Sequence, residues 1–197
     1  MRKIYYNRKS IRLKNYDYSQ HGRYFVTICT KKRECILSQI KPKRVGAGLV
    51  SAHVVLTPMG KFVNNEIKQL EKRFPVKIEK CVIMPDHIHF IININILKWN
   101  GNEKYDIQRN EKYDIKRNEK YDIQRADTRP APTIGQIICA FKSITSNRYI
   151  KYNKQIGEYK KLWQRGYYEK IIRTEKEYYN VCEYIKNNPI RYIQKLY

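Results

Sequence analysis

The sequence has few acidic residues, no C-x-x-C pair and no long apolar run in its 197 residues. Its cysteines are odd in number and scattered, at Cys29, Cys35, Cys81, Cys139 and Cys182. We therefore expect reduced thiols in a cytoplasmic protein and no structural zinc site. The absence of a long apolar run argues against a membrane span, and the basic N-terminus lacks the apolar stretch of a secretory signal. The length suits one domain with one core.

Positive charge dominates the composition. The chain carries 41 Lys and Arg against 18 Asp and Glu, a formal net charge of +23. Such an excess points to a polyanionic partner, nucleic acid first and an acidic membrane surface second. The N-terminal segment 1–20 interleaves cations with tyrosines, a mixture that suits single-stranded nucleic acid, although a solubilising tail has the same composition. Its candidate contacts are Arg8, Lys9, Arg12 and Lys14.

Hydrophobic patterning predicts an α+β domain. Strands are expected at 23–30, 53–56, 76–84 and 87–96, and a short extended segment at 167–173. Helices are expected after the Thr57-Pro58 pair, at 133–150 and at 174–188, the last of them closed by Pro189. The Pro85-Asp86 turn should pair its two flanking strands antiparallel. This order predicts an antiparallel sheet with helices packed on one face.

A tandem repeat interrupts this pattern in a variable loop at 100–130. Residues 102–125 read NEKYDIQR, NEKYDIKR and NEKYDIQR, an eight-residue period repeated three times. Eight residues fit a helical period poorly, and three units are too few for a solenoid. The three copies together carry a net charge of +1, so +22 belongs to the rest of the chain. The repeats are therefore not expected to form the polyanion-binding surface.

Two histidines, His87 and His89, alternate at the start of a predicted strand. Residues i and i+2 of a strand share one face, so the two imidazoles should lie side by side as half of a metal site. On the last helix Tyr184 falls at the border of the apolar stripe, and Asn188 follows one turn later. A tyrosine can act as a nucleophile and an amide oxygen as a metal ligand. A border tyrosine that only packs is the competing interpretation.

Four sequence blocks resemble the HUH single-tyrosine transposases, in particular the REP-associated tyrosine transposase branch. They are GRYFVTICT at 22–30, VIMPDHIH at 82–89, TIGQIICAFKS at 133–143, and WQRGYYEKIIR at 163–173 followed by EYIKNNP at 183–189. The resemblance implies a ferredoxin-like or RNA-recognition-type sheet. It also implies that His87, His89 and Asn188 bind a divalent metal, Mg²⁺ or Mn²⁺, and that Tyr184 is the nucleophile.

The implied activity is metal-dependent transposition of single-stranded DNA, with nicking and strand transfer at hairpin-containing sites through a 5′-phosphotyrosine. Such a protein works in the bacterial cytoplasm, at the nucleoid when bound to DNA. Further DNA contacts are expected at Lys31, Lys32, Arg33, Gln164 and Arg165. A monomer is expected, with a dimer left open. Two alternatives stand beside this hypothesis: a non-catalytic nucleic-acid-binding module on an RNA-recognition-type sheet, and an HUH replication-initiator or relaxase-type nickase.

Overall fold

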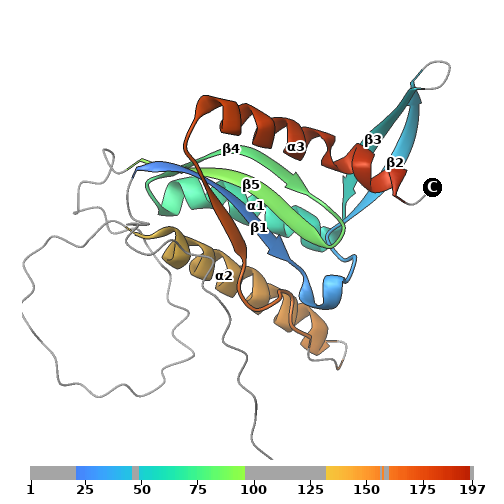
Figure 1. Cartoon of the computed structure of the whole chain (residues 1–197). Coiled ribbons are helices and arrows are strands. Elements are labelled where there is room, and N and C mark those ends of the chain that lie inside the picture. The colour runs from blue at the N-terminus through green and yellow to red at the C-terminus, as the bar shows by residue number, and fades with distance from the viewer. Residues whose placement is uncertain (1–20, 46–48, 96–131, 156, 158–159, 196–197) are drawn as a thin grey trace, which may run out of the picture.

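The computed structural model describes residues 21–45, 49–95, 132–155, 157 and 160–195. Their elements follow one another as β1 (Gly22–Cys29), η1 (Lys31–Arg33), β2 (Ser38–Val45), β3 (Leu49–Leu56), α1 (Pro58–Arg73), β4 (Val76–Ile83), β5 (His87–Ile94), α2 (Ile134–Gln155), β6 (Tyr168–Ile172) and α3 (Glu175–Gln194) (Figure 1). The N-terminal segment 1–20 and the repeats at 102–125 lie outside these residues. The predicted α+β class is confirmed.

Four strands form an antiparallel sheet in the order β4-β5-β1-β6. Helix α1 connects β1 to β4, and α2 precedes β6, which gives two interleaved β-α-β units. This is the ferredoxin-like arrangement expected from the sequence. The Pro85-Asp86 turn joins β4 to β5, and Met84 N donates to the carbonyl oxygen of His87 at 2.8 Å across it.

The main core lies between the sheet and the helices α1 and α2. Alternate residues of β1, namely Tyr24, Val26 and Ile28, are fully buried on this face. Helix α1 adds Val63, Ile67 and Leu70, which lie three or four residues apart and so share one face of the helix. It begins at the predicted cap, where the Thr57 hydroxyl accepts a hydrogen bond from Gly60 N at 3.0 Å. Burial of these aliphatic side chains is the main source of stability.

Helix α3 packs on the opposite face of the sheet, so that α2 and α3 lie on opposite sides in Figure 1. Ile185 of α3 is buried against Ile91 of β5 and Ile172 of β6, with Phe25 at the edge of the cluster. The sequence predicts helices on one face of the sheet, whereas α3 lies on the other face. An amphipathic stripe shows that a helix packs on a sheet, but it does not show on which face. The second face matters, because it is the face of the alternate residues His87 and His89.

Two helices are longer than predicted. Helix α2 continues to Gln155. The expected end of α3 at residue 188 is wrong, because the helix passes through Pro189 and continues to Gln194. A proline in a helix loses one backbone hydrogen bond. Here Pro189 and Ile193 are buried, and α3 contacts β2 and β3, so packing outweighs that loss.

The strands β2 and β3 form a separate antiparallel hairpin inserted between η1 and α1. The sequence indicated β3 but not β2. In Figure 1 this hairpin projects away from the sheet beside the C-terminal half of α3. In the part of the chain that the structure describes, no helix combines the length and apolar character needed to cross a membrane.

Candidate active site

Two imidazoles lie side by side where β5 begins. His87 and His89 are 8% and 4% exposed, and their ring centroids are 4.6 Å apart. The intervening Ile88 is buried in the main core on the other face. Alternation along the strand therefore directs both histidines toward α3, as the H-x-H spacing predicts.

Both Nδ1 atoms are engaged by neighbouring side chains. His87 Nδ1 lies 2.6 Å from Asp86 Oδ1, and His89 Nδ1 lies 2.8 Å from the Thr27 hydroxyl oxygen. Among the described residues, His89 Nε2 is buried without a hydrogen-bond partner. An unpaired polar atom in the interior is costly unless something binds it. Such a nitrogen is a suitable ligand for a divalent cation, so the residues present fit a metal site.

Burial keeps both imidazoles neutral. Desolvation is the largest cause that lowers the pKa of His89 to about 3, followed by the repulsion that a protonated His87 and Arg33 would exert on a protonated His89. The pKa of His87 is lowered as well, chiefly by desolvation, while Asp86 opposes the shift. A metal-binding imidazole must be unprotonated on the coordinating nitrogen. The pair meets this requirement at neutral pH.

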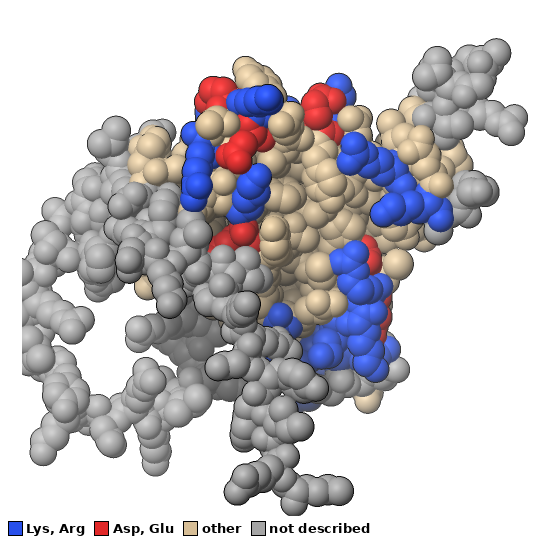
Figure 2. Space-filling model, in the orientation of Figure 1, with Lys and Arg blue, Asp and Glu red and all other residues tan. Residues whose placement is uncertain are grey.

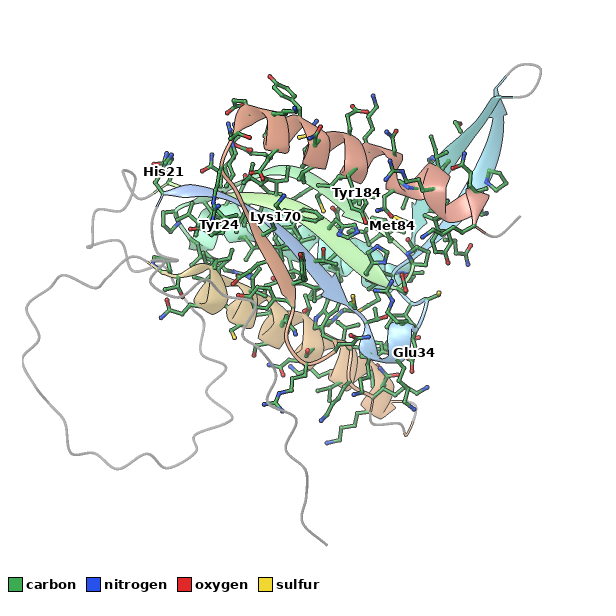
Figure 3. All side chains as sticks on the ribbon, in the orientation of Figure 1. His21, Tyr24, Glu34, Met84, Lys170 and Tyr184 are labelled. Carbon is green, nitrogen blue, oxygen red and sulfur yellow. The ribbon has the colours of Figure 1, made fainter. Side chains whose placement is uncertain are left out.

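The tyrosine predicted as nucleophile lies over this pair. The Tyr184 ring meets that of His89 edge to face at a centroid distance of 5.2 Å, between α3 and the sheet (Figure 3). Phe25 stacks on His89 at 5.3 Å and meets Tyr184 at 5.9 Å. The Tyr184 side chain remains 37% exposed. It is thus held near the histidines and open to a substrate from solvent.

Helix α3 positions this tyrosine. Its first turn is capped by the Thr174 hydroxyl, which accepts from Glu177 N at 3.1 Å. Asn188 is helical and 9% exposed, one turn beyond Tyr184. Within the described ranges, no group of three His, Cys, Asp or Glu is arranged to hold a metal. A cation at the histidine pair would therefore take further ligands from an amide, a phosphate or water. The role of Asn188 as such a ligand stays a prediction.

Four contacts at this site are not indicated by the sequence pattern. Asp86 was interpreted only as a turn residue, yet its carboxylate touches both His87 and Arg33, the latter at 2.7 Å. Thr27 supports His89 from β1. The Arg191 guanidinium lies 5.7 Å from the Tyr184 ring centroid. Arg191 follows Tyr184 by two helical turns, a spacing that indicates the same side of the helix.

The predicted DNA-contact residues fall into three groups. Lys31, Lys32 and Arg33 are exposed in η1, next to the end of β1. Arg165 is exposed and Gln164 is half-buried in the loop before β6, where Gln164 N donates to the carbonyl oxygen of Cys29 at 2.9 Å. The N-terminal group, Arg8, Lys9, Arg12 and Lys14, lies outside the described residues.

Basic side chains flank the face that carries the site. Figure 2 shows one group of Lys and Arg over the η1 end of the sheet and another over the end of α3 and the base of the β2–β3 hairpin. An uncharged area lies beside these two groups, and Lys and Arg intermixed with Asp and Glu border its other side. Cations on both sides of an uncharged area suit an extended polyanion that crosses the area.

No protein-family model matches the chain. A Haemophilus influenzae protein described as uncharacterized is 36% identical over 191 residues, which cover 96% of this chain and 92% of that protein. A solved REP-associated tyrosine transposase bound to a REP hairpin matches 92% of this chain and 74% of its own, with a TM-score of 0.51 and 16% identity. A putative transposase from Deinococcus radiodurans gives a TM-score of 0.45 at 13% identity. The resemblance to REP-associated tyrosine transposases is thus confirmed at the level of the fold.

Proposed function

We propose that this chain, which belongs to the same protein family as the Haemophilus influenzae relative, is a metal-dependent single-stranded DNA transposase that acts at hairpin-containing sites. One observation carries the proposal. Two buried, neutral histidines and a half-exposed tyrosine meet within one chain, with ring centroids 4.6 and 5.2 Å apart. The shared fold with a transposase solved on a REP hairpin supports the choice of DNA as substrate.

Tyr184 supplies the nucleophile. Its phenol oxygen forms a bond to a backbone phosphorus, and the bond between phosphorus and the 3′ oxygen breaks. The phenol loses its proton, and the leaving 3′ oxygen gains one. The product is a 5′-phosphotyrosine with a free 3′-hydroxyl, so the bond energy is retained for a second strand end to attack. Both steps proceed without ATP.

His87 and His89 would hold the divalent ion through their Nε2 atoms, since both Nδ1 atoms are already engaged. Asn188 is proposed as the amide-oxygen ligand. A bound cation supplies Lewis acidity toward the scissile phosphate. Imidazole ligands suit Mn²⁺ better than Mg²⁺, which prefers an all-oxygen shell. We therefore expect Mn²⁺ to support activity at least as well as Mg²⁺.

The neighbouring cations would bind the DNA backbone. Lys31, Lys32 and Arg33 on η1 and Arg165 before β6 are placed to contact phosphates, and Gln164 adds a polar group. Phosphate contacts of this kind set position and affinity rather than sequence. Since the histidines and the tyrosine meet within one chain, the proposed site needs no second subunit, which supports a monomer.

The principal alternative is a non-catalytic module that binds nucleic acid on its open sheet face. Such modules stack bases on exposed aromatic side chains of the sheet. In this chain α3 covers that face, and Phe25 packs against His89 and Tyr184. A replication-initiator or relaxase-type nickase would share the tyrosine chemistry and differ in the absence of strand transfer between two ends.

The decisive experiment is covalent trapping. The purified chain is incubated with labelled single-stranded DNA containing hairpins, with Mn²⁺ or with a chelator, and denatured before electrophoresis. We expect an adduct that needs the metal and disappears in Tyr184→Phe. Tyr179→Phe is the matched control, because Tyr179 lies on the same helix and is 63% exposed. An adduct that persists in Tyr184→Phe, or hairpin binding with no adduct at all, would contradict the proposal.

A further inference from the structure

We infer that Asp86 is a positioning residue of the histidine pair, which fixes His87 with its Nε2 lone pair available, and that Arg33 holds the Asp86 carboxylate in place. The inference rests on the proposed function for its purpose. It concerns contacts within the chain and is testable without any DNA.

The carboxylate of Asp86 is divided between two partners. Oδ1 lies 2.6 Å from His87 Nδ1, and Oδ2 lies 2.7 Å from Arg33 Nε. Asp86 is 8% exposed, so water competes little for either oxygen. With both oxygens engaged, the carboxylate is placed to orient an imidazole rather than to serve as a free ligand. Carboxylate–histidine pairs of this kind fix the ring and its tautomer at metal sites.

The backbone of the Pro85-Asp86 turn is fixed from two sides. The backbone N of the buried Thr30 donates to the carbonyl oxygen of Asp86 at 2.9 Å, and the Thr30 hydroxyl lies between that oxygen at 2.9 Å and the carbonyl oxygen of Glu34 at 2.8 Å. Leu37 N donates to the carbonyl oxygen of Pro85 at 3.0 Å. The Asp86 side chain therefore starts from a defined position.

The turn of η1 brings Arg33 to this carboxylate. Lys32 and Arg33 have φ values of 55° and 59°, in the left-handed region that L-residues seldom occupy. Such conformations persist where surrounding contacts enforce them. The Arg33 guanidinium is held at a second point, where Nη1 donates to Cys29 Sγ. Arg33 is 49% exposed at its side chain, so a phosphate contact and this ion pair are compatible.

The chemical consequence lies in the tautomer of His87. A neutral imidazole that donates Nδ1–H to a carboxylate has its lone pair on Nε2. An asparagine at position 86 has a weaker acceptor, and its NH₂ group can donate to Nδ1. That donation favours the opposite tautomer, in which Nε2 carries the proton and cannot bind a cation. Asp86→Asn thus changes few atoms and removes the orientation.

The test has two readouts on metal-free protein at neutral pH. Imidazole ¹⁵N chemical shifts of the wild type should show His87 with its proton on Nδ1, and Asp86→Asn should shift the population toward Nε2–H. Mn²⁺ titration should show about 10- to 100-fold weaker binding in Asp86→Asn, the loss typical of outer-shell partners. Glu79→Gln is the matched control, because Glu79 also pairs with an arginine, Arg23 at 3.1 Å, near Asn93 toward the other end of β5.

The outcomes separate the two proposals. Proton on Nε2 in wild-type His87 would overturn the inference without any variant, even if Asp86→Asn did not fold. Equal Mn²⁺ affinity of Asp86→Asn and wild type, with an unchanged tautomer, would also overturn it and leave the transposase proposal intact. No Mn²⁺ binding by the wild type would contradict metal-dependent function, and the tautomer measurement would still decide the role of Asp86.

Discussion

At the scale of one residue, burial keeps His89 unprotonated, as its proposed role of metal ligand requires. Its ring is enclosed by Phe25, His87 and Tyr184, and desolvation is the main cause that lowers its pKa to about 3. The cost of this burial is a sensitivity to acid in the metal-free protein. Below the ordinary histidine pKa of about 6.5, His89 is protonated in the unfolded chain but stays neutral in the folded chain.

Stability should therefore fall as the pH drops from about 6.5 toward 3. Between pH 7.5 and 4.5, His89 should lower the free energy of unfolding by about 2–3 kcal/mol. This figure follows because pH 4.5 lies roughly two units below the pKa of histidine in the unfolded chain, and each unit is worth about 1.4 kcal/mol. Urea unfolding at both pH values with chelator present measures it. His89→Gln should show a smaller pH-dependent loss than the wild type, whereas His53→Gln, at an exposed position, should match the wild type. An unchanged loss in His89→Gln would contradict this account.

The residues of the site differ in how far the sequence predicts them. Alternation predicts that His87 and His89 share a face, and helical geometry places Tyr184 at a border, where it is 37% exposed. The contact of Arg33 with Asp86 was not predictable in the same way. It joins two turns far apart in the chain and depends on a left-handed backbone at Lys32 and Arg33 that no local pattern indicates.

At the scale of elements, α3 carries Tyr184, the proposed nucleophile. Its start is well defined, because Thr174 caps Glu177 N and the Glu177 carboxylate accepts from Arg173 N at 2.8 Å. The Thr174 hydroxyl thus caps the helix, and Glu177 reaches back one residue beyond the N-cap, to Arg173 N rather than to Thr174 N as in a reciprocal capping box. The helix packs on the sheet through Ile185 near its middle, and it also contacts β2 and β3, which lie beside its C-terminal half in Figure 1.

Removal of the N-cap at Thr174 should destabilise the start of α3 and make the position of Tyr184 less defined. Thr174→Ala is expected to cost about 1 kcal/mol of unfolding free energy, within the range of roughly 0.5–2 for lost N-caps. It should also slow formation of the Tyr184 adduct. Thr174→Asn retains a capping oxygen and serves as the control. Thermal unfolding and adduct time courses measure both effects, and equal behaviour of the two variants would contradict the proposed role of the cap.

The missed and extended elements have physical explanations. Strand β2 contains Pro42 and several cations, which argue against a strand within a sheet. In a two-stranded hairpin, however, each strand has an open edge, where a missing N–H is tolerated. Helix α3 continues beyond Pro189 because the tertiary contacts of Pro189 and Ile193 outweigh local propensity. Sequence patterns report local preference and do not include such contacts.

At the scale of the whole molecule, charge is distributed unevenly along the chain. The formal net charge is +23, and the 24 residues of the repeats contribute only +1 of it. The face in Figure 2 shows the described Lys and Arg residues gathered on both sides of an uncharged area. Affinity for DNA should therefore depend on the rest of the chain.

Deletion of residues 102–125 should leave the affinity for a DNA hairpin, and the salt dependence of that affinity, nearly unchanged. In contrast, Lys31→Gln combined with Lys32→Gln should weaken binding and lower the slope of log K against log salt by roughly one unit per lost phosphate contact. Fluorescence anisotropy at several salt concentrations measures both. A large loss of affinity in the deletion variant, with an unchanged slope in the lysine variant, would contradict this assignment of the binding surface.

The two faces of the sheet differ in how much they bury. Helices α1 and α2 share a large cluster with β1 and β5, whereas α3 rests on a small one built on Ile91, Ile172 and Ile185. Opening of α3 thus disrupts fewer contacts than global unfolding does. The α1–α2 side of the sheet can therefore stay folded while α3, which carries the proposed nucleophile, opens. Substitutions on α3 can alter the proposed chemistry without unfolding the domain, so relatives that keep the fold and lack the proposed reaction are an expected evolutionary outcome of this architecture.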